Sequence, residues 1–234
     1  MVDKQTLIDT IFIGGILTDT PIWSGSQWGA AVDNSIPTYP LDPRAAEGLM
    51  NQAGFSKGAD GFYRGAEGRL SPLELVSTAT PDKVQQTAVL SDWFKAAGFD
   101  TQQRIIPAAQ SRDNEVRSTF PGLLVISGTA GESALGLLAS ASIPGPGNRW
   151  VGINRGGWSS ADYDRIFSAF NTTLDRGERV GQVRQMLRIY SEELPIVSLA
   201  FSVGDDAVVS ALKGPSMVAP ESNPAWNIHD WEFH

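Results

Sequence analysis

The strongest constraint on the fold is one long helical segment that lies between two short strand-like segments. Thr80 and Pro81 have the pattern of an N-cap followed by a first-turn proline, and Gly98 has the pattern of a helix stop. Residues 73–77 before this helix and residues 103–106 after it are predicted to be strands. A strand, a helix and a second strand in this order place two parallel strands in one sheet. The sequence therefore predicts an α/β fold in which helices flank a mixed sheet.

Two shorter helices are predicted nearer the N-terminus from their caps. Asp3 is expected to cap the first, and Asp42, followed by Pro43, is expected to open a second helix that ends at Gly54. Between them, residues 18–39 are rich in Pro, Gly, Ser and Trp and show no period. This segment is predicted to be a long loop, and loops of that length in compact domains tend to be functional.

The second half of the chain contains two helices with apolar stripes. A Ser159-x-x-Asp162 capping box is expected to begin the first helix, and Pro195 is expected to close the second. Residues 123–127 are predicted to add a strand to the sheet, and the apolar run 196–203 predicts a buried strand. The core-facing residues expected in the two helices are Tyr163, Ile166, Phe167, Phe170 and Leu174, followed by Val180, Val183, Leu187, Tyr190 and Leu194.

Composition and charge exclude several classes of function. The 234 residues are 41% hydrophobic and 19% charged, as in globular proteins, and the net charge is -8. This charge argues against a nucleic acid partner, because duplex binding needs Lys and Arg to neutralise phosphates. The absence of cysteine excludes disulfides, thiolate metal sites and cysteine catalysis. Residues 1–7 lack a basic region followed by an apolar one, so the signal of an exported parent is expected upstream.

No catalytic, metal or cofactor site is predicted. The two histidines, His229 and His234, lie at the C-terminus, and with Asp230 they do not supply an ordered zinc site. Ser159 fits a helix cap better than a nucleophile elbow, because the final glycine of that motif is missing. The glycine-rich segments match no phosphate-binding loop. The chain is therefore predicted not to be an enzyme.

Four of the seven tryptophans lie in segments rich in Gly, Pro and Ser: Trp23, Trp28, Trp150 and Trp158. Aromatic rings on loops suit a solute-binding cleft, because they bury a large area at little cost in rotamer entropy. The alternative is that these rings cover the core from outside. They also leave open a second function, that of a carbohydrate-active enzyme or carbohydrate-binding module in which loop tryptophans bind sugar rings.

The order of several segments resembles the second half of the family 5 extracellular solute-binding proteins, the dipeptide, oligopeptide and nickel-binding group. The resemblance spans essentially the whole chain, and its strength lies in the collinear order of motifs that are individually weak. The matching segments are 39–55, 60–63 and 73–75, the helix 80–99, the Asn154-Arg155-Gly156-Gly157-Trp158 segment with the residues up to Asp164, the helix 173–193, Leu194-Pro195-Ile196-Val197, and the closing segment 226–232.

The resemblance implies one lobe of a two-lobed fold like that of type II periplasmic binding proteins. Residues 1–203 would form the C-terminal lobe, and residues 204–234 a return segment that packs on a first lobe outside this sequence. The implied function is the solute-binding component of an ABC transporter, which binds a peptide or related small solute and closes on it before contacting a membrane permease. The implied location is periplasmic or extracellular, at the membrane if the parent is a lipoprotein. An exposed cleft face could also drive dimerisation.

The residues expected to bind the solute are Trp23, Trp28, Arg117, Gly128, Glu132, Asn154, Arg155 and Trp158. Peptide binders of the family carry a Trp and then an Asp after the strand equivalent to 123–127, and the Asp pairs with the peptide amino group. This chain lacks that Trp, and only Glu132 could replace the acid. Arg117 lies near a cleft arginine of the family and could meet a carboxylate in bidentate fashion, or it could be a solvated surface charge.

Overall fold

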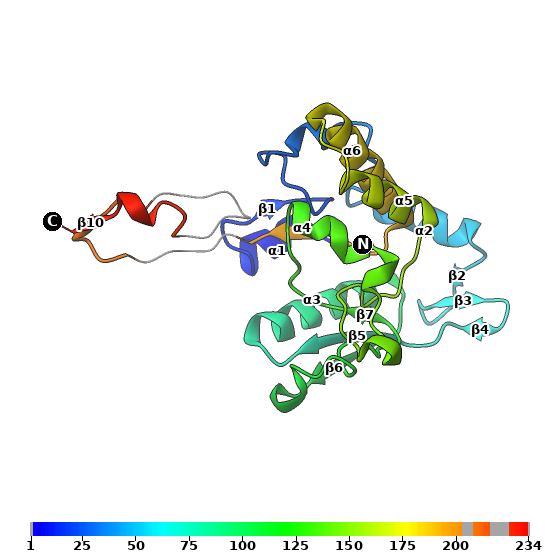
Figure 1. Ribbon diagram of the computed structural model, residues 1–234. Coiled ribbons are helices and arrows are strands. Elements are labelled where there is room, and N and C mark those ends of the chain that lie inside the picture. Colours follow the sequence, from blue (N-terminus) through cyan, green and yellow to red (C-terminus); the bar gives the residue numbers. More distant parts are fainter. Residues whose placement is uncertain (1, 203–207, 216–224, 234) are drawn as a thin grey trace. The chain divides into compact units, whose positions relative to one another are not determined.

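The computed structural model describes residues 2–202, 208–215 and 225–233, which form two compact units (Figure 1). The first unit comprises Met1–Ile11, Thr38–Ser127 and Ser140–Trp158. The second comprises Phe12–Pro37, Gly128–Ala139 and Ser159–His234. Among the described residues, helices accompany one parallel sheet and three small antiparallel sheets, so the predicted α/β class is confirmed, with parallel and antiparallel pairs in separate sheets. No helix among the described residues has the length and hydropathy needed to cross a bilayer.

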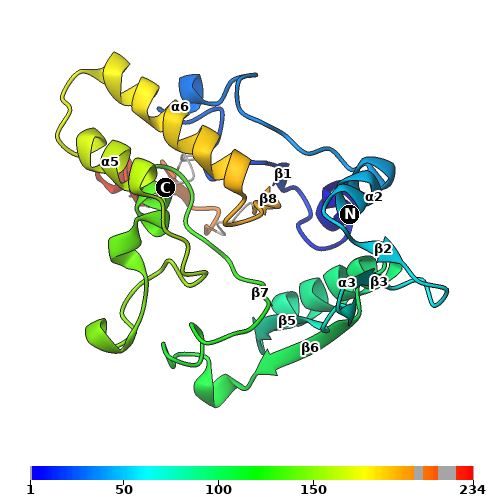
Figure 2. The ribbon, with the colours of Figure 1, turned by 90° about the vertical axis from the view of Figure 1, so that its right-hand side faces the viewer.

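The centre of the first unit is the predicted strand–helix–strand crossover. β5 (Leu73–Thr78) lies between β6 (Thr101–Ile106) and β7 (Leu123–Leu124), and both neighbours run parallel to it. Figure 2 shows α3 (Pro81–Ala97) running beside β5 and β6. β7 ends earlier than the expected 123–127, although Val125 still donates a backbone hydrogen bond to Val76.

The buried face of α3 is mostly polar. Its buried residues are Lys83, Gln86, Thr87, Leu90 and Ser91. Several of these polar groups find partners inside the unit: Lys83 Nζ donates to Gln86 Oε1 at 3.1 Å, and Ser91 Oγ donates to Thr101 Oγ1 of β6 at 2.9 Å, whereas Nε2 of Gln86 is buried without a partner. The helix ends as predicted at Gly98, whose φ of 110° places it in the left-handed region that favours glycine.

Two helices and a small sheet complete the first unit. Asp3 caps α1 (Lys4–Thr10) and Asp42 caps α2 (Pro43–Gln52) through backbone hydrogen bonds to their carboxylates, as predicted. The small sheet joins β2 (Ser56–Lys57), β3 (Tyr63–Gly65) and β4 (Gly68–Arg69). Tyr63 holds this sheet to the end of α3, because its backbone N–H donates to Gly98 O and its ring packs on Phe99.

The second unit is built on α5 (Ala161–Phe170) and α6 (Arg176–Glu193), and the predicted apolar stripes mostly form its core. The capping box was placed one residue too early: Ser160, not Ser159, accepts the hydrogen bond from Tyr163 N. Adjacent serines offer the same cap chemistry, and the extended backbone of Ser160 decides between them. The buried residues of the two helices are Tyr163, Ile166, Phe170, Val183, Met186, Leu187, Tyr190 and Ser191.

The ends of the two stripes were predicted wrongly. Leu174 is 97% exposed, because it lies in the link between α5 and α6 and not within either helix. Leu194 is 41% exposed and adopts φ 48° as the left-handed residue that ends α6. The strand expected over 196–203 shrinks to β8 (Ala200–Phe201), with Ile196 and Val197 exposed before it; residue 203 lies outside the described part.

The remaining segments of the second unit are short. β1 (Ile16–Leu17) pairs antiparallel with β8, and β9 (Leu212–Lys213) pairs antiparallel with β10 (Glu232–Phe233). α4 (Glu132–Leu135) begins after Gly131. The long loop predicted over residues 18–39 contains only one short 3-10 helix, η1 (Gly29–Ala31). The described part of the chain has further 3-10 helices in both units: η2 (Ala108–Gln110), η4 (Ser140–Ser142) and η5 (Pro146–Asn148) in the first, and η3 (Gly136–Leu138) and η6 (Ile228–Asp230) in the second.

Candidate functional site

Two groups of predicted site residues are brought together, one in each unit. The group in the second unit surrounds Trp28, which is only 4% exposed. Its indole Nε1 donates to Glu132 Oε2 at 3.0 Å, across 104 positions of sequence. Its ring meets Phe170 of α5 edge-on, with the ring centroids 5.3 Å apart. Trp28 therefore follows the core-covering alternative that the sequence left open for loop tryptophans.

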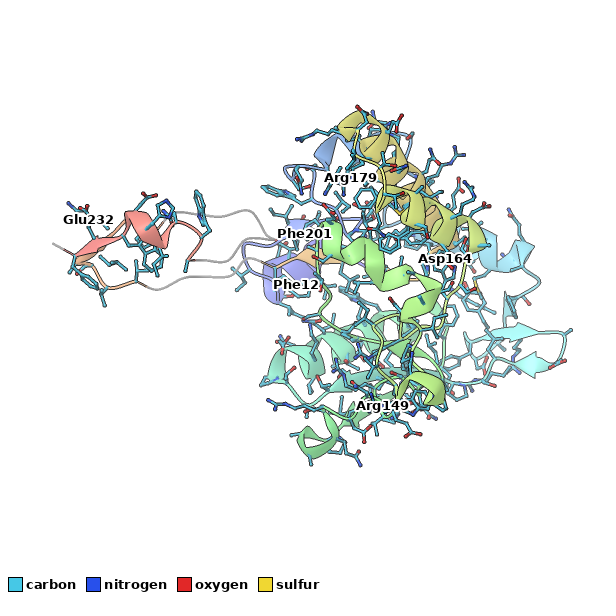
Figure 3. The ribbon with its side chains drawn as sticks, in the orientation of Figure 1. Phe12, Arg149, Asp164, Arg179, Phe201 and Glu232 are labelled. Carbon is cyan, nitrogen blue, oxygen red and sulfur yellow. The ribbon has the colours of Figure 1, made fainter. Side chains whose placement is uncertain are left out.

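Arg179 of α6 completes this group (Figure 3). Its guanidinium donates to Glu132 Oε1 at 2.9 Å and lies over the rings of Phe170 and Trp28, 4.1 and 4.8 Å from their centroids. Both carboxylate oxygens of Glu132 are thus engaged, one by a cation and one by an indole N–H. The charge of Glu132 is balanced within the unit.

Two further arginines of α6 fasten the 18–39 loop to the helix. Arg176 donates to Gln27 O at 3.2 Å, and Arg184 donates to Ala30 O at 2.8 Å while its Nε lies 2.6 Å from Asp33. The sequence reading missed these roles because it followed only the apolar stripe of the helix. The arginines that recur along this helix were the sequence signal that could have indicated contacts between the helix and a loop.

The other predicted residues of the second unit are more accessible. Trp23 is half-buried, and Gly25 packs directly against its ring. Gly128 is exposed, and a Cβ added there would meet nothing within 4 Å. Three residues later, Gly131 is fixed by a hydrogen bond from its N–H to Pro21 O at 2.8 Å and by a φ of 74°. The exposed Gly128 is therefore followed by a firmly held turn.

The group in the first unit is built on the segment 154–158. Asn154 is 2% exposed, and its side-chain amide donates to Trp158 O at 2.8 Å. Gly157 closes the turn with φ 67° and donates its N–H to Asn154 O. Asn154 therefore holds the backbone that presents the half-buried side chains of Arg155 and Trp158.

Arg155 and Arg117 form a pair of like charges. Burial lowers the pKa of Arg155, and the positive charge of Arg117 lowers it further. The Nε of Arg155 is buried without a hydrogen-bond partner. Neither guanidinium pairs with a carboxylate anywhere in the described ranges. In the second unit, Nε of Arg179 also has no hydrogen-bond partner, but its guanidinium lies 2.9 Å from Glu132, and Nε of Arg184 lies 2.6 Å from a carboxylate oxygen of Asp33.

Within the described ranges, no three His, Asp or Glu side chains gather as they would around a metal ion. His229 is exposed and lies 3.5 Å from Asp230, and His234 lies outside the described residues.

The sequence of the chain matches a known protein family. Residues 1–141 match the family described as bacterial extracellular solute-binding proteins, family 5 middle. This match covers more than half of the chain. The chain belongs to family 5 of the bacterial extracellular solute-binding proteins. The resemblance seen in the order of sequence motifs is thereby confirmed.

Curated relatives of this family 5 chain carry the names of binding proteins. It is 24% identical over 213 residues to the di/tripeptide-binding protein 1 of Pseudomonas aeruginosa, a match covering 86% of the chain and 35% of that protein. It is 23% identical to the heme-binding protein A of Haemophilus influenzae, covering 91% of the chain and 37% of that protein. The family 5 chain thus spans little more than a third of the length of these relatives.

Solved structures support the fold. NikZ from Campylobacter jejuni, solved with Ni(L-His), matches with a TM-score of 0.74 at 18% identity over 98% of the chain and 46% of NikZ. The oligopeptide-binding protein AppA from Bacillus subtilis, solved with a nonapeptide, matches with a TM-score of 0.69 at 15% identity over 100% of the chain and 45% of AppA. The predicted likeness to a type II periplasmic binding protein is therefore confirmed.

Proposed function

We propose that the family 5 chain is part of the solute-binding component of an ABC importer and that it acts by binding, without catalysis. The observation that carries the proposal is the family match over residues 1–141. The names of its relatives support a peptide or related small molecule as the solute. A permease in the membrane would then be the partner. The chain would act in the periplasm or outside the cell, at the membrane if the complete protein is a lipoprotein.

Each unit is proposed to offer its own solute-facing residues. In the first unit these are Arg117, Arg155 and Trp158, which are partly exposed. In the second unit they are Trp23 and Gly128. The three other predicted site residues are proposed to position these contacts, because Trp28 and Asn154 are buried and the carboxylate of Glu132 is engaged.

The division at residue 203 remains part of the proposal. Residues 1–203 would belong to the C-terminal lobe of the complete binding protein, and residues 204–234 would return to its first lobe. Coverage of little more than a third of each curated relative fits a lobe-sized part of a larger protein.

A carbohydrate-active enzyme is not favoured by any contact in either unit. Trp28 is committed to packing, and Glu132 is paired with Arg179.

The proposal is tested by uptake and by binding. Deletion of the gene that encodes this chain is expected to reduce uptake of at least one radiolabelled solute from a panel of di- and oligopeptides, nickel–histidine and heme. Isothermal titration of the 234-residue chain with the same panel is expected to show saturable binding without conversion of the solute. Unchanged uptake of every solute, or turnover of any one of them by the purified chain, would overturn the proposal.

A further inference from the structure

In the first unit, α3 turns polar side chains toward the parallel sheet and leaves an apolar one outside. Lys83 and Gln86 are 8% and 2% exposed, whereas Val84 between them is 37% exposed. A helix normally buries its apolar residues, because burying a polar group without a partner costs free energy. Departures from this pattern tend to mark functional sites, so the inner face of α3 is a candidate for a ligand.

Ser77 of β5 points toward the same helix. Leu73 of β5 is paired with Thr101 of β6, and Ser91 of α3 donates a hydrogen bond to Thr101 Oγ1. Thr101 therefore faces α3, and Leu73 lies on the same side of the sheet. Side chains alternate along a strand, so Ser77, four residues after Leu73, is also on the side that α3 covers.

Ser77 and Gln86 lie at the same end of this helix–sheet interface. β5 ends at Thr78 and α3 begins at Pro81, so the connection is short and the helix returns over the strand that precedes it (Figure 2). In such a crossover, the first turns of the helix lie beside the last residues of the strand. Ser77 is the last residue but one of β5, and Gln86 is in the second turn of α3.

Two buried polar atoms at this end have no hydrogen-bond partner among the described residues. They are Oγ of Ser77, a residue that is 0% exposed, and Nε2 of Gln86. The other end of the Gln86 amide is occupied, because Lys83 Nζ donates to Oε1 at 3.1 Å. Buried polar groups are nearly always hydrogen-bonded, to protein or to ordered water. Both atoms therefore need a partner that the side chains around them do not supply.

The charges beside these atoms favour a neutral ligand. Lys83 Nζ lies 3.4 Å from the carboxylate of Asp82, so a small anion would compete with Asp82 for this lysine. Nε2 of Gln86 is a donor, and the hydroxyl of Ser77 can donate or accept. A water molecule can accept from the amide and donate to the hydroxyl, and the ammonium of Lys83 has further N–H groups for a third bond. Buried waters typically make about three hydrogen bonds.

We infer that a buried water molecule is bound between β5 and α3, where Ser77 Oγ and Gln86 Nε2 hold it. The water would join the strand to the helix of the crossover at the centre of the first unit. The polar inner face of α3 then lines a hydrated site. All of its residues belong to the first unit, so the inference is independent of the solute and of the proposed function.

Stability measurements on Ser77→Ala give a test in solution in which the sign of the change decides. If a water is bound, the variant loses a hydrogen bond, and the ratio of folded to unfolded chain should fall about fivefold. In a dry site the variant would remove an unsatisfied polar atom, and the ratio would rise. Ser91→Ala is the matched control, because it removes a hydrogen bond to Thr101 from the same interface and should lower the ratio in both cases. Urea denaturation measures both variants, and a stabilised Ser77→Ala would overturn the inference.

A high-resolution crystal structure of the 234-residue chain tests the site directly. Electron density for one ordered water is expected at about 2.7–3.2 Å from both Ser77 Oγ and Gln86 Nε2. A second crystal soaked in sodium bromide separates water from a small anion, because bromide is located by its anomalous scattering. No bromide peak is expected between β5 and α3. A bromide peak at this position, or a direct hydrogen bond between Ser77 and Gln86 with no density between them, would overturn the inference.

Discussion

Arginine side chains have carboxylate partners in the second unit, whereas two arginines of the first unit have none among the described residues. In the second unit, Arg179 and Arg184 each have a carboxylate within 2.9 Å, and Arg179 also lies over two aromatic rings. In the first unit, Arg155 and Arg117 face each other's charge and pair with no acid among the described residues. Arginines with partners are expected to stabilise a fold, whereas like charges without partners weaken it slightly and attract an anion. Under the proposed function, this difference separates residues that stabilise the fold from residues that face a solute.

The largest expected effect concerns the structural side of this comparison. Trp28→Ala should lower the free energy of unfolding by about 3–5 kcal/mol, because it removes a buried ring and its contacts with Phe170 and Arg179. Trp23→Ala, at a half-buried loop position, is the matched control and should cost clearly less. Urea denaturation measures both. Equal losses of stability in the two variants would show that the buried contacts of Trp28 add nothing, and would contradict a structural role for the group around Arg179.

The next largest effect on the free energy of unfolding is expected for Arg179→Met. Methionine keeps much of the apolar stem but leaves Glu132 without its cation, so a loss of about 1–3 kcal/mol is expected. The double variant Arg179→Met with Glu132→Gln should recover part of this loss, since no unpaired charge remains. A double-mutant cycle by urea denaturation gives the coupling energy. Additive losses would show that the ion pair does not stabilise the unit.

A smaller loss is expected at Asn154. Asn154→Ala removes a buried hydrogen bond to Trp158 O, which should cost about 1–2 kcal/mol. If the segment positions Arg155 for a solute, binding of a solute from the uptake panel should weaken as well, as calorimetry at a temperature where the variant is folded would show. Asn148→Ala serves as the comparison, because it removes side-chain hydrogen bonds to Gly145 N and Ile143 O in the same unit. Full solute affinity in a destabilised Asn154→Ala variant would restrict this residue to a structural role.

The smallest expected effect is on the stability of the first unit when an arginine is removed. Arg117→Gln should change the free energy of unfolding by less than about 1 kcal/mol, and in the stabilising direction at low salt. Added salt should erase the gain by screening the repulsion. Thermal denaturation at two ionic strengths checks this. A destabilised variant at low salt would reveal a structural partner for Arg117 and remove the contrast between the units.

Local signals in the sequence were enough for much of the fold. The caps at Asp3 and Asp42, the stop at Gly98 and the crossover around α3 depend on neighbouring residues and could be recognised directly. Errors arose where neighbours offered equivalent choices, as at Ser159 and Ser160, or where a stripe ran past the end of its helix, as at Leu174.

The contacts of the candidate sites could not be predicted in the same way. The hydrogen bond between Trp28 and Glu132 joins residues 104 positions apart, and Arg179 reaches Glu132 across 47. Only the folded chain brings these groups together. The sequence could propose Arg117 and Arg155 separately, but their mutual repulsion and the lack of an acid partner depend on how the unit packs.

The most direct test of the difference between the two kinds of arginine is the NMR signal of the Nε–H groups during titration with a solute that the chain binds. We expect the Arg155 signal to shift with saturation, because this group gains an acceptor. The Arg179 signal should stay in place, since Glu132 already holds that guanidinium. A shift of Arg179 while Arg155 remains unchanged would contradict the assignment of the first unit to solute binding.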